Sequence, residues 1–151
     1  MGICLSYAKS RDLAQEIVHD SFLKFFDSVK KLEDTPSIKP WLRRITVNTA
    51  IDYYRRNKKF QNHEEADGET PVFDAEYAPD QLAYEEILKL LNQLPDDHQL
   101  VFNLYEVEGY SHKEVAERLE ITESSSRVYL TRAKSKLRQL IHIHFKEYAG
   151  R

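Results

Sequence analysis

Residues 111–138 read SHKEVAERLEITESSSRVYLTRAKSKLR, a pattern that predicts two consecutive helices. Ser111 stands three positions before Glu114, a capping-box spacing that predicts the start of a helix. Residues 120–122 follow as a short turn, in which Thr122 can cap a second helix that runs to about residue 141. Two helices joined by so short a turn predict a helix-turn-helix, a unit whose second helix enters the major groove in proteins that bind duplex DNA.

The exposed side of the second helix carries side chains suited to DNA. Short donors for phosphates or base edges are Ser124, Ser125 and Ser126. Arg127 and Arg132 can make bidentate contacts with guanine. Cations expected to reach the phosphate backbone are Lys134, Lys136 and Arg138. A plain helical hairpin with a solvated basic face is the alternative interpretation of the same pattern.

Helical periodicity covers most of the chain outside this stretch. An apolar stripe predicts a helix over about 12–29, and a second, strongly basic helix is expected over about 39–58. Two prolines between them, Pro36 and Pro40, forbid one continuous helix. Downstream, another apolar stripe runs over about 82–94, and a further helix is expected to begin near Leu100 and to end at Gly109. No strict alternation typical of strands occurs, so the expected fold class is all-α.

Charge is distributed unevenly along a chain whose net charge is -3. The first 60 residues and residues 109–151 are each net basic, whereas residues 61–108 are strongly acidic. Residues 61–80 also lack helical periodicity, which predicts a flexible acidic linker. Two basic blocks on either side of an acidic middle indicate two contacts with a polyanion.

Several function classes are disfavoured. The single cysteine, Cys4, excludes an internal disulfide and any zinc site with several cysteines, and suits the reducing cytoplasm. No apolar run is long enough to insert in a membrane, and the first residues do not read as a secretion signal. The six histidines are scattered, and no phosphate loop or nucleophile elbow occurs. We therefore expect no enzyme, no metal and no cofactor.

The residues resemble regions 2 and 4 of bacterial RNA polymerase sigma factors. The likeness to region 4 rests on Leu94-Pro95, Val101-Phe102, Glu108-Gly109-Tyr110-Ser111, Glu114-Val115-Ala116 and Arg132-Ala133-Lys134. The likeness to region 2 rests on residues 12–22 and on Trp41-Leu42-Arg43-Arg44-Ile45 with Asn48, Asp52, Arg55 and Arg56. Two regions with nothing but a linker between them resemble the extracytoplasmic-function (ECF) layout.

This resemblance implies two small helical domains joined by a flexible acidic linker. Residues 1–60 would form region 2, residues 61–80 the linker, and residues 81–151 region 4 with its helix-turn-helix. It further implies a sigma factor that directs core RNA polymerase to promoters for transcription initiation. Region 4 would read the duplex minus-thirty-five element, and region 2 the melted minus-ten element.

The resemblance also implies site residues and partners. Contacts with the minus-thirty-five element are expected at Ser125, Arg127, Val128, Tyr129, Thr131, Arg132 and Lys134. Contacts with the minus-ten element are expected at Thr35, Ser37, Arg43, Arg44, Asn48, Arg55 and Arg56. Core polymerase is expected to dock on Asp12, Gln15, Glu16, His19 and Asp20. An anti-sigma factor is an expected further partner, and the expected location is the cytoplasm.

Other interpretations stay open at this point. A helix-turn-helix transcriptional regulator could bind DNA without any sigma activity, and would usually act as a dimer on two half-sites. An interaction module without promoter function, such as a decoy, is another. The sigma family usually has Gly-Thr-Val where Ser124-Ser125-Ser126 stand, so the binding mode is predictable from the resemblance but the preferred DNA sequence is not.

Overall fold

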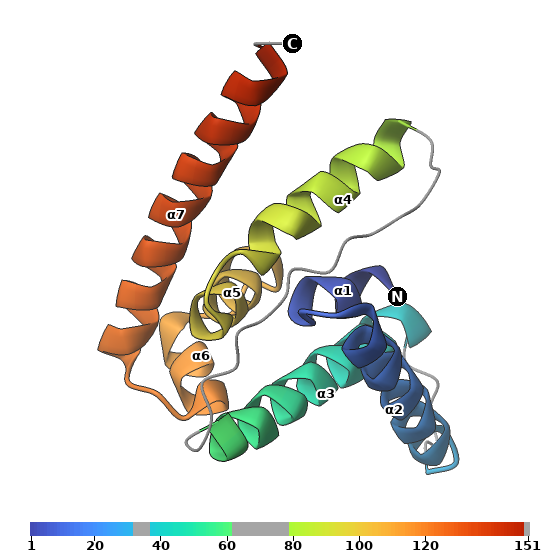
Figure 1. Cartoon of the computed structure of the whole chain (residues 1–151). Helices are drawn as coiled ribbons and strands as arrows, with labels where there is room; N and C mark the ends of the chain where they lie inside the picture. The colour runs from blue at the N-terminus through green and yellow to red at the C-terminus, as the bar shows by residue number, and fades with distance from the viewer. Residues whose placement is uncertain (32–36, 62–78, 150–151) are drawn as a thin grey trace. The chain divides into compact units, whose positions relative to one another are not determined.

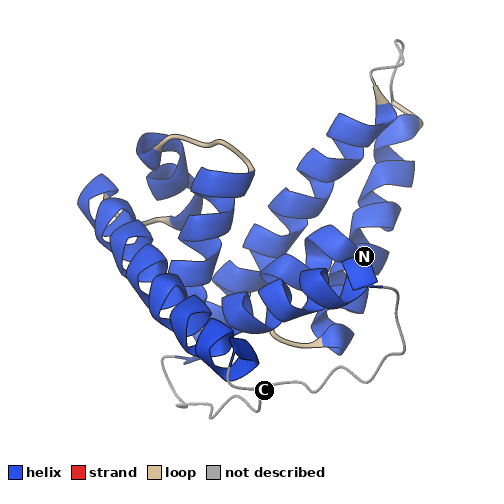
Figure 2. Ribbon diagram, turned by 90° about the horizontal axis from the view of Figure 1, so that it is seen from above, coloured by secondary structure: helices blue, strands red, loops and turns tan. Residues whose placement is uncertain are grey.

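A computed structural model of the 151-residue chain describes residues 1–31, 37–61 and 79–149. These residues form seven α-helices and one π-helical turn, and none of them lies in a strand (Figure 1, Figure 2). The expected all-α class is confirmed. The chain divides into two compact units, Met1–Pro71 and Val72–Arg151, and each is described by itself.

The first unit consists of α1 (Gly2–Tyr7), α2 (Arg11–Val29) and α3 (Ile38–Gln61). The Ser10 hydroxyl begins α2 as its cap, since it accepts a 3.2 Å hydrogen bond from the backbone N–H of Leu13. All three helices contribute to one core, whose fully buried members are Cys4, Ala8, Ala14, Ile17 and Ala50. Burial raises the pKa of the Cys4 thiol, so this cysteine packs as a small apolar side chain.

The second unit consists of α4 (Pro79–Asn92), α5 (Asp96–Phe102), the π-helical turn η1 (Asn103–Val107), α6 (His112–Leu119) and α7 (Glu123–Ala149). Its buried apolar side chains are Leu88, Leu91, Leu94, Leu100, Val101, Leu104, Val115, Ala116, Leu119, Leu130 and Ala133. The helix expected from Leu100 instead begins at Asp96 and continues into the π turn. Gly109 follows with φ +79°, a conformation that glycine adopts without strain.

The predicted helix-turn-helix is α6, a turn and α7. Both bonds of the capping box are present: the Glu114 N–H donates to the Ser111 hydroxyl at 3.2 Å, and the Ser111 N–H donates to the Glu114 carboxylate at 2.8 Å. Between the helices, Glu120 takes φ +57° and closes α6 in the left-handed conformation. At 27 residues, α7 extends beyond the predicted end near residue 141, because no Gly or Pro interrupts the sequence before Gly150.

The expected linker covers residues 61–80. In the structure, Gln61 is the last residue of α3 and Pro79 is the first residue of α4. Residues 62–78 lie outside the described part of the chain. No helix among the described residues combines the length and the apolar character that crossing a membrane requires.

Candidate nucleic-acid interface

Helix α7 has one buried side and one outward side. Ser126, Leu130 and Ala133 recur at helical spacing and are buried against the rest of the unit. The outward side carries four of the residues predicted to contact DNA, and these are all exposed: Arg127, Val128, Thr131 and Arg132. The valine is 43% exposed, so its methyl groups are available for contact with a thymine methyl.

The first turn of α7 is organised by Thr122. Its hydroxyl oxygen accepts the backbone N–H of Ser125 at 3.0 Å, so Thr122 caps the helix as predicted. The same hydroxyl donates to the Ser125 hydroxyl at 2.9 Å. Ser125 is half-buried, and its side chain is held in a defined position at the start of the outward side.

Arg127 forms an ion pair with Glu123 one turn earlier, with Nη2 and Oε2 3.2 Å apart. Both side chains are largely exposed, at 58% and 44%, and such pairs contribute little stability in water. The guanidinium can therefore leave Glu123 for a base or phosphate at small cost. The Thr131 hydroxyl donates to the Arg127 carbonyl at 3.0 Å, so it is engaged with its own helix.

Three serines were predicted on the exposed side of α7, and this prediction is wrong for Ser126, which is fully buried. Its hydroxyl lies 2.9 Å from Nδ1 of His112, the first residue of α6. Spacing gives the signal that could have shown this, since Ser126 continues the apolar stripe of Leu130 and Ala133 one turn toward the N-terminus.

Two other predicted DNA contacts on α7 are engaged within the second unit. Tyr129 is half-buried, with its ring centroid 5.2 Å from that of His98 on α5. Lys134 forms an ion pair with Glu106 of η1. Burial lowers the pKa of His98, and the nearby Arg132 lowers it further.

His112 is a residue that sequence reasoning assigned no role. Besides its contact with Ser126, its ring stacks on Tyr105 of η1, with centroids 4.3 Å apart and planes inclined by 22°. Burial lowers the pKa of His112, and the positive charges of Arg127 and Lys134 add to this against the opposing effect of Glu123. The imidazole is therefore neutral at neutral pH.

In the first unit, the cationic side chains predicted to contact DNA lie along α3. Arg43, Arg44 and Arg56 are exposed, while Asn48 and Arg55 are half-buried. Arg44, Asn48 and Arg55 share one face of the helix by their spacing. Ser37 is exposed immediately before α3, and Thr35 lies outside the described residues.

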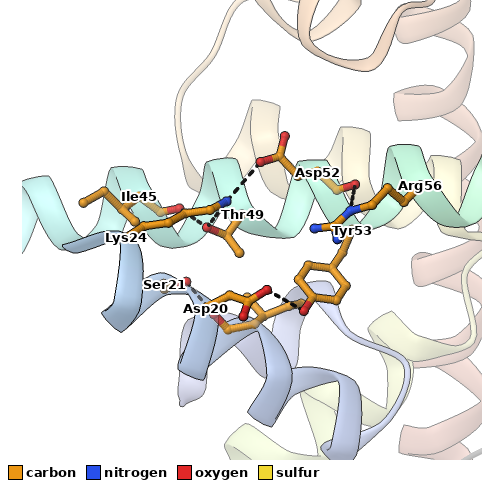
Figure 3. A network of polar contacts seen from close by, with 9 residues as sticks. Asp20, Ser21, Lys24, Ile45, Thr49, Asp52, Tyr53 and Arg56 are labelled. Atoms are coloured by element: carbon orange, nitrogen blue, oxygen red, sulfur yellow. Dashed lines mark hydrogen bonds and ion pairs between the residues drawn. The ribbon is translucent and has the colours of Figure 1, made fainter. Parts of the chain in front are cut away.

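A polar seam joins α2 to α3, as Figure 3 shows. The Lys24 ammonium donates to the Thr49 hydroxyl at 3.2 Å and to the Asp52 carboxylate at 3.1 Å. The Tyr53 hydroxyl donates to Asp20 at 2.7 Å, and this bond, with burial and the charge of Asp20, raises the pKa of Tyr53 to about 12. This seam fixes how the basic helix α3 lies against α2.

The residues predicted to bind polymerase share one side of α2. Asp12, Gln15, Glu16 and His19 are all exposed and follow one another at helical spacing. Asp20, at the edge of this group, is half-buried and bonded to Tyr53. Within the described residues, no group of three or more His, Cys, Asp or Glu side chains is arranged to hold a metal ion.

Comparison with known proteins shows similarity across both units. The family model "Sigma-70 region 2" matches residues 1–60, and "Sigma-70, region 4" matches residues 84–137. The RNA polymerase sigma factor SigZ of Bacillus subtilis is 30% identical over 167 residues, covering 96% of this chain and 86% of SigZ. SigV of the same organism is 31% identical over 115 residues, covering 76% of this chain and 68% of SigV.

Two further similarities extend this result. The ECF RNA polymerase sigma factor SigM of Bacillus subtilis is 27% identical over 138 residues, covering 90% of this chain and 84% of SigM. Among solved structures, the sigma factor RpoE of Bartonella quintana, crystallised with the anti-sigma factor NepR, matches with a TM-score of 0.60. That match has 20% identity and covers 93% of this chain and 88% of the other, so it supports the fold.

Proposed function

The chain belongs to the sigma-70 family of RNA polymerase sigma factors, and we propose that it directs core RNA polymerase to specific promoters for transcription initiation. The observation that carries this proposal is the outward side of α7, which presents two arginines and an exposed valine from the second helix of a helix-turn-helix. The chain acts as a non-catalytic specificity subunit.

The second unit, taken as residues 81–151, reads the duplex minus-thirty-five element in this proposal. Its contacts with bases and backbone come from Ser125, Arg127, Val128, Thr131 and Arg132. Arginine at such positions favours guanine, and the valine suits a thymine methyl. Tyr129 packs on His98 of α5 and so supports α7. Lys134 contacts phosphate once its ion pair with Glu106 opens.

The first unit, taken as residues 1–60, handles the melted minus-ten element. Bases that leave the stack need donors and cations that offset the cost of unstacking. The proposed set is Thr35, Ser37, Arg43, Arg44, Asn48, Arg55 and Arg56. Arg56 is held over the ring of Tyr53, 4.5 Å from its centroid, so it lies in a defined position beside the other cations of α3.

Core polymerase docks on the exposed side of α2 formed by Asp12, Gln15, Glu16 and His19, with Asp20 at its edge. The two acids at positions 12 and 16 can steer this surface toward basic groups of the partner. Residues 61–80 act as the linker between the two promoter-binding units. An anti-sigma factor that covers these surfaces is the proposed inhibitor, and the cytoplasm is the proposed site of action.

Transcription with purified components tests the proposal. The chain is added to bacterial core polymerase with a library of genomic fragments, and run-off transcripts that require the chain are identified. We expect promoter-specific transcripts, and we expect the double variant Arg127→Ala/Arg132→Ala to lose them. Lys146→Ala is the matched control, because it removes an exposed cation from the last turn of the same helix.

Two results would contradict the proposal. Failure of the chain to co-purify with core polymerase, together with sequence-specific binding to DNA, would instead indicate a helix-turn-helix regulator without sigma activity. Binding to polymerase without any transcript would indicate an interaction module such as a decoy.

A further inference from the structure

The buried hydroxyl of Ser126 is a polar group inside the apolar junction of α6 and α7. Its neighbours along the buried side of α7 are Leu130 and Ala133, and the serine has no exposed surface. A buried hydroxyl is costly unless it is hydrogen-bonded. The contact of 2.9 Å with Nδ1 of His112 satisfies it, so Ser126 and His112 act as a matched pair across the helix-turn-helix.

His112 is itself held in place from two directions. It is the first residue of α6, directly after the capping box at Ser111, so its backbone position is fixed by two hydrogen bonds. Its ring stacks on Tyr105 of η1 at 4.3 Å. The imidazole of His112, at the start of α6, therefore contacts both the π turn η1 and the second helix α7.

A second connection joins η1 to α7 further along. Glu106, the residue after Tyr105, forms an ion pair with Lys134. Ser126 and Lys134 are eight positions apart, which places them about 12 Å apart along the helix axis and about 80° apart around it. The π turn thus holds α7 at two levels, once through His112 and once directly.

Two attachments at different heights and different angles around a helix restrain its rotation about its own axis. The side chains of Arg127, Thr131 and Arg132 lie on the outward side, so their directions depend on that rotation. A turn of about 15° moves a group at the helix surface by roughly 1.5 Å. Recognition sites need geometry held to about 0.5 Å and 10–20°, so this rotation matters for base readout more than for attraction to phosphates.

We propose that His112 and Ser126 are positioning residues for base readout: the 2.9 Å contact between them sets the rotation of α7 and so the discrimination between DNA sequences. Neither side chain contacts a base. This inference rests on the proposed function, because it assigns the pair a part in reading the minus-thirty-five element.

Three single variants and one double variant separate the contributions of the imidazole ring, its Nδ1 atom and the serine hydroxyl. His112→Phe keeps a ring that can stack on Tyr105 but removes the nitrogen that faces Ser126. Ser126→Ala removes the hydroxyl. His112→Asn retains a polar nitrogen near the position of Nδ1 and is the conservative variant expected to rescue discrimination. The double variant His112→Phe/Ser126→Ala removes both polar partners, so no buried group is left unsatisfied.

The matched control is Ser21→Ala in the first unit. Ser21 is also a buried serine, 2% exposed, and its hydroxyl donates to the Ile17 carbonyl at 2.5 Å. Its removal takes one hydroxyl from the buried side of α2, outside the helix-turn-helix. It therefore reports what the loss of a buried serine hydroxyl does by itself.

The experiment uses the full chain assembled with core polymerase. A duplex is first selected from a randomised pool by the wild-type complex, and a scrambled duplex of equal length serves as the reference probe. The dissociation constants for both probes are measured at one salt concentration, and their ratio is the discrimination. Circular dichroism of each free variant reports its helicity.

We expect His112→Phe and Ser126→Ala each to reduce the discrimination about tenfold, with binding to the scrambled duplex unchanged. The double variant should be no worse than either single variant, and His112→Asn and Ser21→Ala should stay near the wild-type ratio. An unchanged ratio in both single variants, or an equal loss of affinity for both duplexes, would overturn the inference. A wild-type complex that fails to form or selects no sequence would instead overturn the proposed function.

Discussion

The hydroxyl of Tyr53 on α3 donates a 2.7 Å hydrogen bond to Oδ2 of Asp20 on α2 (Figure 3). On the same aromatic ring, the Arg56 guanidinium lies 4.5 Å from the centroid. Asp20 borders the surface proposed to bind polymerase, and Arg56 belongs to the group proposed to contact the minus-ten element. Tyr53 therefore connects the two proposed surfaces of the first unit. We expect a substitution on one surface to alter the other.

Tyr53→Phe removes this connection and leaves the ring in place. We expect the variant to lower the stability of the α2–α3 contact by about 1 kcal/mol, since a hydrogen bond to a carboxylate is lost. Amide hydrogen exchange of α2 and α3 measures this. Tyr54→Phe is the control, because it removes the neighbouring hydroxyl, which accepts from Lys58 one turn later in α3.

The raised pKa of Tyr53 gives the same contact a pH dependence. Because the folded-state pKa of about 12 lies above the ordinary 10, the contribution of Tyr53 to stability is fully present below pH 10 and is lost as pH rises through 12. Ultraviolet absorbance of tyrosinate should show one tyrosine that titrates near 12, absent from Tyr53→Phe and present in Tyr54→Phe. A titration curve identical in all three proteins would contradict this assignment.

Glu120 is the one non-glycine residue with positive φ in the described part of the chain, at 57°. Glycine adopts this conformation without the steric penalty of a Cβ atom, so Glu120→Gly should stabilise the turn by up to about 1 kcal/mol. Glu117→Gly, at an exposed position inside α6, should instead destabilise by about 1 kcal/mol. Hydrogen exchange of α6 and α7 amides distinguishes the two, and the same sign for both would refute the argument.

The second unit should lose stability in mild acid. The pKa values of His98 and His112 are both lowered from the ordinary 6.5, chiefly by burial, so the folded state disfavours their charged forms. Their contribution is present above pH 6.5 and is lost as pH falls through the lower folded-state values. Hydrogen exchange of α7 at pH 5 and pH 7, corrected for intrinsic exchange rates, should show weaker protection in acid.

The double variant His98→Gln/His112→Asn should flatten that dependence. His142→Gln is the control, because His142 is exposed near the end of α7. If the double variant keeps the full loss of protection in acid, other groups are responsible.

Glu106 forms an ion pair with Lys134, a cation proposed to contact phosphate. Glu106→Gln releases this cation, so we expect tighter binding to any duplex and a salt dependence steeper by about one unit in the logarithmic slope. Discrimination between sequences should fall at the same time, because one attachment of α7 to η1 is lost. Fluorescence anisotropy over a salt series measures both, with Glu117→Gln on exposed α6 as the charge-matched control. Equal slopes for wild type and Glu106→Gln would show that Lys134 takes no part in phosphate contact.

Short patterns in the sequence predict much of the local structure of this protein. The capping box at Ser111 and Glu114, the cap at Thr122 and the spacing of the acidic side of α2 all appear in the structure as predicted. These features depend on residues within one or two turns of one another, so spacing alone defines them. The resemblance to two sigma regions extends the same local patterns across the chain.

Which side chains are available to a partner depends instead on how the helices pack together. Ser126 faces inward and contacts His112, 14 positions away. Asp20 accepts a hydrogen bond from Tyr53, 33 positions away. Tyr129 packs on His98, and Lys134 forms an ion pair with Glu106. The physical reason is that such partners meet where helices pack together, so these contacts depend on residues far apart in the sequence and not on the spacing within one helix.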